Sequence, residues 1–230
     1  MSKLVVMNFS GNVGKSTVAR HLLSPRMNNA VIISVESINS DGSQDETVRG
    51  RQFGELSEAT AILDDVVVDV GASNVEDFLS QMAAYRGSHN DFDYFVIPTV
   101  PKSKQMRDTI SSIEALREAG VPAEKIRLLF NMVELKESPE SLFSALYNYY
   151  QSEKSFTINS KALIHVSDLF SKIGTSNIKD ILNDKSDFKT LAEKAKEIDE
   201  KVKLNRLLGI QRLAAGVNEE LDAVFKTLLS

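Results

Sequence analysis

The stretch Ser10-Gly11-Asn12-Val13-Gly14-Lys15-Ser16-Thr17 decides the fold class, because it follows a short apolar run and opens a helical pattern. Its two glycines allow the backbone to turn tightly and to approach phosphate oxygens closely. The backbone N–H groups of such a loop, together with the first turn of the helix, present partial positive charge to an anion. We therefore predict a phosphate-binding loop with these binding residues: Gly11, Asn12, Val13, Gly14, Lys15, Ser16 and Thr17.

Two side chains in this loop carry the chemistry. Lys15 is expected to reach the β- and γ-phosphates of a nucleoside triphosphate as a point charge, in both binding and catalysis. Ser16 is expected to place its hydroxyl on Mg²⁺. The full pattern G-x-x-x-x-G-K-[ST] is not met, because Phe9 stands at the first glycine position, but residues 14–17 keep the Gly-Lys-Ser-Thr core.

Short apolar runs alternate with helical patterns along the rest of the chain. The runs are continuously apolar, which is typical of strands buried on both faces of a parallel sheet. This alternation predicts an α/β fold with a doubly wound, mostly parallel sheet. The predicted strands are residues 4–7, 30–35, 66–70, 94–97, 126–130 and 162–166, and the predicted helices are residues 15–24, 51–63, 74–86, 103–119 and 139–151.

The sequence suggests a nucleotide-binding domain over residues 1–185 and C-terminal helices over residues 186–230 that pack on it. Apolar residues spaced by three and four predict one stripe on the tail, formed by Phe188, Leu191, Ala195, Ile198 and Val202. An alternative is a membrane- or partner-binding helix, which rests on the cluster Lys201, Lys203, Arg206 and Arg212.

Composition narrows the classes of function. The chain of 230 residues has a net charge of −5, which argues against a chain-wide attraction to nucleic acid. It has no cysteine, so thiol catalysis and thiolate metal sites are excluded, and its three histidines show no metal-ligand spacing. No apolar run is long enough to span a bilayer, so we expect a cytoplasmic protein without a stable membrane anchor.

Carboxylates near the predicted strand ends are candidates for metal binding and catalysis. Asp69 ends the strand Val66–Val70, and we predict that it orders Mg²⁺ in the manner of a Walker B aspartate; the alternative is a helix cap or a strand-end charge. Glu36 and Asp41 follow the second strand, where either one would orient the attacking water, unless this segment is only a polar loop.

Further candidates lie later in the chain. Asn131 is predicted to end the fifth strand and to contact a purine base, with a loop or capping role as the alternative. Pro98 and Pro101 are expected to stiffen the loop after the fourth strand. His21 is expected to be a packing or surface residue. The basic run Lys102, Lys104 and Arg107 is expected to be a solvated helix start, with nucleic-acid contact as the alternative.

Residues 10–17 resemble the deviant Walker A motif of ParA/MinD-type ATPases, K-G-G-x-G-K-[ST]-[ST]. The positions of Asp69, Ile97-Pro98 and Asn131 are similar to this family's Walker B residue, proline loop and base-contacting asparagine. More narrowly, residues 8–15 and 69–74 resemble the StbB plasmid-stability branch. The resemblance implies ATP and Mg²⁺ as cofactors, a nucleotide-dependent homodimer, plasmid stability or partition as the role, and a separate DNA-binding adaptor, with a non-specific DNA contact as a further option.

Two departures from the family motif affect the expected activity. Ser10 replaces the signature lysine that reaches across the dimer, and Asn12 replaces the second glycine. The missing lysine implies slow, Mg²⁺-dependent ATP hydrolysis, since charge stabilisation carries much of phosphoryl transfer. Two other functions remain open on the same fold: a small-molecule kinase or ligase, and a MinD-like membrane-associated ATPase.

The sequence predicts a preference for ATP over GTP. Residues 131–134, Asn-Met-Val-Glu, lack the Asn-Lys-x-Asp signature of guanine-binding proteins, and the family resemblance implies ATP. A competition assay with a labelled ATP analogue measures this preference. Equal or tighter binding of GTP would contradict the prediction and would remove the base contact from Asn131.

Overall fold

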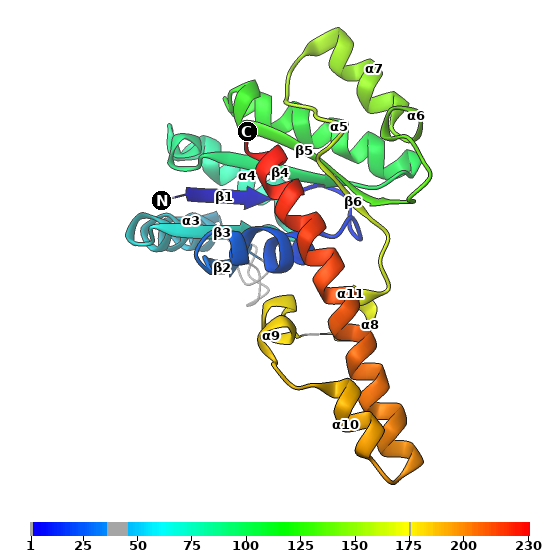
Figure 1. The fold of residues 1–230 in the computed structure, drawn as a ribbon. Helices are drawn as coiled ribbons and strands as arrows, with labels where there is room; N and C mark the ends of the chain where they lie inside the picture. The colour runs from blue at the N-terminus through cyan, green and yellow to red at the C-terminus, as the bar shows by residue number, and fades with distance from the viewer. Residues whose placement is uncertain (1, 36–45, 175) are drawn as a thin grey trace. The chain divides into compact units, whose positions relative to one another are not determined.

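The computed structural model describes residues 2–35, 46–174 and 176–230. Its first compact unit, residues 1–166 and 224–230, is built on a parallel sheet of six strands in the order β2-β3-β1-β4-β5-β6 (Figure 1). This arrangement confirms the predicted fold class. The strands are β1 Ser2–Val6, β2 Val31–Ser34, β3 Asp65–Asp69, β4 Tyr94–Thr99, β5 Ile126–Val133 and β6 Leu163–His165.

The sheet places the end of β1 at its centre. Val6 lies between Asp69 of β3 and Val96 of β4 in the strand register. β2 and β3 extend the sheet on one side of β1, and β4, β5 and β6 extend it on the other. In open parallel sheets, ligands bind outside the carboxyl ends of the strands where the strand order reverses. The loop that follows β1 begins at this position.

Helices cover both faces of the sheet (Figure 1). The segment directly after the loop contacts β3 on one face, and α5 contacts β4 on the other. The helical elements of this unit are α1 Lys15–Thr17, η1 Val18–Leu23, α2 Ser24–Arg26, α3 Glu46–Ile62, η3 Ala72–Asn74, α4 Val75–Ala84, η4 Ser88–Asp91, α5 Ser103–Glu118, η5 Ala123–Lys125, α6 Pro139–Leu142 and α7 Ser144–Glu153.

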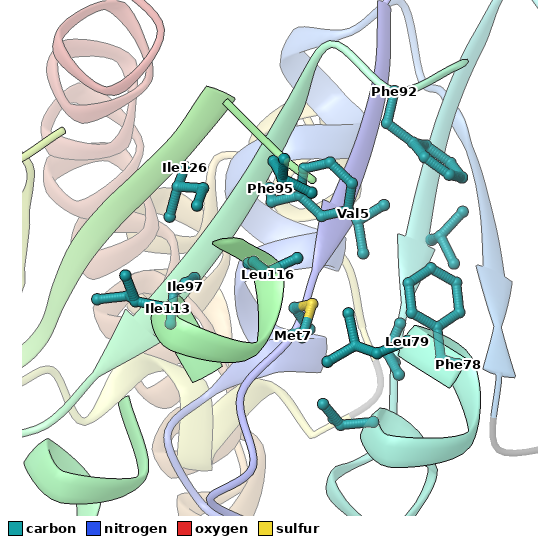
Figure 2. Packing of buried hydrophobic residues seen from close by; sticks show 14 of the residues in the cluster. Val5, Met7, Phe78, Leu79, Phe92, Phe95, Ile97, Ile113, Leu116 and Ile126 are labelled. Carbon is teal, nitrogen blue, oxygen red and sulfur yellow. The ribbon is translucent and has the colours of Figure 1, made fainter. Parts of the chain in front are cut away.

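An apolar cluster joins the sheet to the helices α3, α4, α5 and α7. Figure 2 shows part of this cluster. Alternate strand residues point into it, because successive side chains of a strand face opposite sides. Burial of each large apolar side chain contributes about 1.5–3 kcal/mol. The members labelled in Figure 2 are Val5, Met7, Phe78, Leu79, Phe92, Phe95, Ile97, Ile113, Leu116 and Ile126, all at most 7% exposed.

The prediction of strands buried on both faces is wrong for β2. Val31 is 49% exposed and Ile32 is 36% exposed. The reason is topological, since β2 lies at one edge of the sheet and, among the described residues, pairs with β3 alone. Residues 66–68 of β3, the neighbouring interior strand, are fully buried as predicted.

The helix predicted over residues 15–24 begins as expected but is not a single α-helix. After the short α1, residues Val18–Leu23 form a π-helix, and α2 extends the segment to Arg26. Five of the six π-helical residues are buried: Val18, Ala19, His21, Leu22 and Leu23. The helical segment thus anchors the phosphate loop to the sheet through an almost wholly buried turn.

Two predicted strand ends are corrected by the hydrogen-bonded register. Pro98 lies inside β4, paired with Leu129, rather than in a loop after the strand. Proline lacks the N–H of the ladder, but Pro98 lies two residues beyond Val96, the last β4 residue paired with β1, and its carbonyl accepts a hydrogen bond from the Asn8 side-chain amide. Asn131 lies within β5, which continues to Val133 through an irregularity at Met132, whose φ is +56°.

The second compact unit comprises residues Ser167–Ala223. It contains α8 Leu169–Ile173, α9 Ile178–Asn183, α10 Phe188–Lys194 and most of α11 Ile198–Leu228, whose last residues, from Val224, belong to the first unit. Asp187 caps α10 by accepting a hydrogen bond from the Thr190 amide at 3.0 Å.

The single apolar stripe predicted for the tail is wrong. The chain leaves the helical conformation at Ala195, whose φ and ψ are −61° and 137°, so α10 and α11 are separate helices. Leu191, Ile198 and Val202 are 45%, 77% and 63% exposed. The apolar residues on the two sides of this break therefore do not form one buried face.

Within residues 2–35, 46–174 and 176–230, no helix combines the length and the apolar character that crossing a bilayer requires.

The end of α5 generates a stability prediction. Gly120 adopts a φ of +87°, and the amides of Gly120 and Val121 donate backbone hydrogen bonds to the last turn of α5. Gly120→Ala should lower the free energy of unfolding by about 1–2 kcal/mol, because a side chain disfavours the left-handed conformation. Denaturant titration followed by circular dichroism measures the change. Glu118→Ala, at an exposed helical position, is the control and should change stability by less than about 0.5 kcal/mol; equal effects would contradict the role of φ.

Candidate functional site

The loop between β1 and α1 turns through two left-handed residues, of which only Gly14 is one of the two glycines expected to allow the turn. Asn12 and Gly14 adopt φ values of +58° and +88°, in the left-handed region. Glycine and asparagine reach this region more readily than other residues. Gly14 is also the residue that precedes the first turn of α1. The two left-handed residues curve the loop around the position where a helix N-terminus attracts an anion.

Lys15 is folded back over the loop. Lys15 is only 8% exposed, and its Nζ donates to the carbonyl oxygens of Ser10 at 2.8 Å and Asn8 at 3.3 Å. These bonds hold the ammonium group beside the loop backbone. A bound phosphate would receive a cation that is already positioned, as expected for the loop lysine.

The loop borders a cleft of about 530 Å³, a size typical of small-molecule sites. Six of the seven loop residues predicted to bind phosphate line this cleft, and Val13 is buried behind it. The structure adds Ala72 and Ser73, which sequence reasoning missed as binding residues. Their signal was their place directly after the predicted strand that carries Asp69. The lining residues are Gly11, Asn12, Gly14, Lys15, Ser16, Thr17, Ala72 and Ser73.

The two predicted magnesium ligands present oxygen donors of the kind that the ion prefers. Asp69, 8% exposed, ends β3 opposite Val6, the last residue of β1. Ser16 is exposed and lines the cleft. Mg²⁺ commonly takes one or two protein oxygens and completes its shell with phosphate and water. This donor set fits the ion, and Glu36 and Asp41 lie outside the described residues.

Asn131 contacts the phosphate loop directly. Its Nδ2 donates to the carbonyl of Val13 at 2.9 Å, and its Oδ1 accepts from the Met132 amide at 2.9 Å. A Cβ at Gly14 would lie only 2.3 Å from this Nδ2. Asn131 therefore holds the loop backbone in place. Its predicted base contact stays a prediction, since an amide has a second proton and a second lone pair to offer.

A second cleft of about 570 Å³ adjoins the phosphate-loop cleft, because Ala72 and Ser73 line both. It extends toward α5 and contains one ammonium, two carboxylates, two hydroxyls and an aromatic ring. Its lining residues are Phe9, Ala72, Ser73, Glu76, Lys104, Asp108 and Ser111.

The remaining candidates have simpler surroundings. His21 is 5% exposed, and burial, with a smaller contribution from Arg20, lowers its pKa to about 4, so its ring is neutral near pH 7. Lys102, Lys104 and Arg107 are exposed around the start of α5.

No protein-family model and no curated protein matches this sequence. Among solved structures, apo McdA from Cyanothece is 14% identical with a TM-score of 0.49, and the match covers all of both chains. A protein from Borrelia burgdorferi B31 described as a plasmid partition protein, bound to AMPPNP, is 14% identical over 91% of this chain and 97% of its own, with a TM-score of 0.47. MinD in a MinC:MinD cell division complex from Aquifex aeolicus is 12% identical over 74% and 84%, with a TM-score of 0.49.

These structures come from the group of ATPases that the sequence resembles. Their identities are below 25% and their TM-scores are below 0.5, so they assign no function to this chain. The narrower resemblance to the StbB branch stays a prediction.

Asn131→Ala separates the loop contact from a base contact. Loss of the donor to the Val13 carbonyl should weaken binding of both ATP and tripolyphosphate, which has no base, by about tenfold. Calorimetric titration of the two ligands measures this. A variant that binds tripolyphosphate like wild type but loses affinity for ATP would show that Asn131 acts on the base alone.

Proposed function

We propose that this protein binds ATP with Mg²⁺ in the phosphate-loop cleft and acts as a nucleotide-dependent switch of the partition type. The observation that carries the proposal is the preorganised loop. Between β1 and α1, left-handed Asn12 and Gly14 shape the backbone, and the buried Lys15 is held beside it at the carboxyl edge of the sheet. Few other ligands require a fixed cation, a helix start and a cleft at this position.

The proposed metal site uses Ser16 and Asp69. When bound, Mg²⁺ would neutralise charge on the β- and γ-phosphates. The chain's own part is to orient the triphosphate: the loop backbone surrounds it, Lys15 supplies a charge, and Asn131 fixes the Val13 carbonyl. Glu36 or Asp41 is proposed to orient the attacking water.

Hydrolysis is proposed to be slow. Ser10, the residue at the family's signature lysine position, is only 4% exposed. Its amide donates to Asn8 Oδ1 at 2.7 Å, and its carbonyl accepts from Lys15. A serine held in this way brings no charge to the triphosphate of a second copy, and such charges carry much of phosphoryl-transfer catalysis.

The proposed partners follow from the sequence resemblance. They are a second copy of the chain in the nucleotide-bound state and a DNA-binding adaptor, in a role in plasmid stability or partition. A non-specific DNA contact would use the exposed basic residues Lys102, Lys104 and Arg107, and the net charge of −5 leaves no larger attraction to DNA.

One observation favours a second candidate function. The cleft that shares Ala72 and Ser73 with the phosphate-loop cleft has room for another reactant. A small-molecule kinase or ligase would place its acceptor there. Transfer of the γ-phosphate to an added small molecule, rather than to water, would favour this function over the switch.

Lys15→Ala tests the proposed binding site. Loss of the loop cation should weaken binding of a non-hydrolysable ATP analogue by on the order of a hundredfold, since charge-assisted hydrogen bonds to phosphate are the strong ones. Lys102→Ala, which removes an exposed lysine outside both clefts, is the matched control and should bind like wild type. Titration calorimetry with Mg²⁺ present measures the affinity for the analogue. The metal site is tested by titrating Asp69→Ala with and without Mg²⁺ and comparing the two affinities.

The same samples test the switch. Sedimentation velocity with and without the analogue should show dimers only with nucleotide. Wild-type affinity in Lys15→Ala would refute the site, and a monomer in every nucleotide state would refute the dimeric switch while leaving ATP binding intact.

A further inference from the structure

A buried polar network connects the start of the phosphate loop to α5. Its members are fully buried polar side chains on three elements. Burial of a polar group is costly unless the group is hydrogen-bonded, so such a cluster needs partners for its members. The lysine of the loop was expected from the sequence, but this network was not. Its residues, each 0% exposed, are Asn8, Thr99, Thr109 and Ser112.

Asn8 is the centre of the network. Its Nδ2 donates to the Pro98 carbonyl at 3.0 Å and to Thr109 Oγ1 at 2.8 Å. Its Oδ1 accepts from the Ser10 amide at 2.7 Å. The side chain therefore ties the loop backbone to β4 and to α5 at once, with both protons of its amide in use.

Two hydroxyls on α5 complete the connection. Thr109 Oγ1 lies 2.9 Å from Thr99 Oγ1 of β4 and 2.7 Å from the Gln105 carbonyl. Ser112 Oγ accepts from the Phe9 amide at 3.0 Å and donates its single proton to the Asp108 carbonyl at 2.7 Å. Two consecutive backbone amides, those of residues 9 and 10, thus donate to side chains of the network: Phe9 to Ser112 of α5 and Ser10 to Asn8.

The network also reaches the functional lysine. The Asn8 carbonyl is one of the two acceptors of Lys15 Nζ, and the Ser10 carbonyl is the other. One of these carbonyls belongs to Asn8 itself, and the other belongs to Ser10, whose amide donates to the Asn8 side chain. A shift of Asn8 would therefore move the acceptors that hold the ammonium group.

We infer that Asn8 is a positioning residue for the nucleotide site, and that α5 sets the geometry of the phosphate loop through Thr109 and Ser112. This inference rests on the proposed nucleotide binding. It adds that loss of an α5 hydroxyl weakens nucleotide binding beyond its effect on folding, although Thr109 and Ser112 line neither cleft.

Thr109→Val is the test variant, because it removes the hydroxyl but keeps a branched side chain of similar size. Thr109→Ser keeps the hydroxyl and is the rescue variant. Thr60→Val is the matched control: Thr60 is 2% exposed, and its Oγ1 donates to the Ser57 carbonyl at 2.9 Å, a hydrogen bond that stays within α3. Each variant is titrated with a non-hydrolysable ATP analogue and unfolded in denaturant without nucleotide.

We expect the dissociation constant to rise about tenfold in Thr109→Val, from the loss of one buried hydrogen-bond partner of Asn8. It should stay near the wild-type value in Thr109→Ser and Thr60→Val, even if Thr60→Val unfolds more easily. Amide hydrogen exchange at residues 9 and 10 should be faster in Thr109→Val than in wild type.

The outcomes separate the two claims. If wild type binds the analogue and Thr109→Val binds it equally well, the positioning role is wrong and the proposed function stands. If Thr109→Val and Thr60→Val lose affinity alike, the effect is one of general stability and the inference is also wrong. If wild type binds no nucleotide, both the proposed function and this inference fail.

Discussion

The structure depends on how the carbonyl groups of one loop are satisfied. A loop that offers its N–H groups to an anion must find donors for its carbonyls, since unpaired buried backbone groups are costly. Lys15 donates to the carbonyls of Asn8 and Ser10, and Asn131 donates to that of Val13. One of these donors lies in the loop's own helix and the other on β5. The parallel sheet brings them together, because the carboxyl ends of β1 and β5 lie at the same edge.

The sheet therefore serves as a frame for the loop, and the apolar cluster behind it fixes the frame. Met7 and Ile97 are buried in this cluster, each one residue from Asn8 or Pro98, so packing determines where the polar contacts begin (Figure 2). The helical segment after the loop supplies the remaining support for the loop. Its π-helical turn is nearly all buried, which keeps the first turn against the sheet. Packing and the hydrogen bonds to its carbonyls together keep the loop ready for a ligand.

Local patterns predicted the strands and the loop well. Continuous apolar runs and the Gly-Lys-Ser-Thr core are short-range signals, and the six strands and the left-handed Gly14 follow from them. Contacts across the fold were not predictable in this way. Asn131 lies 118 residues from its partner Val13, and its neighbours in the sequence do not distinguish a contact with the loop from a contact with a base.

The other differences have equally physical causes. Exposure of Val31 depends on which strand ends the sheet, and that order is a property of the topology. The break between α10 and α11 falls at Ala195-Lys196-Glu197, without the glycine or proline that usually marks a helix end. The helical spacing of the apolar residues therefore predicted one stripe across this break. The carboxylates Glu36 and Asp41 remain predictions, because they lie outside the described residues.

The contact between Gly14 and Asn131 makes the two positions unequal in how they tolerate change. A side chain at residue 14 meets two obstacles, the φ of +88° and the amide 2.3 Å away. Shortening Asn131 would remove only the second, so no compensating substitution at 131 restores an alanine at 14. Residue 131, in contrast, acts on the loop through one donor to the Val13 carbonyl, which another side chain with an N–H group could supply. In a genetic selection for nucleotide binding, suppressors should therefore arise for defects at 131 but not for defects at 14.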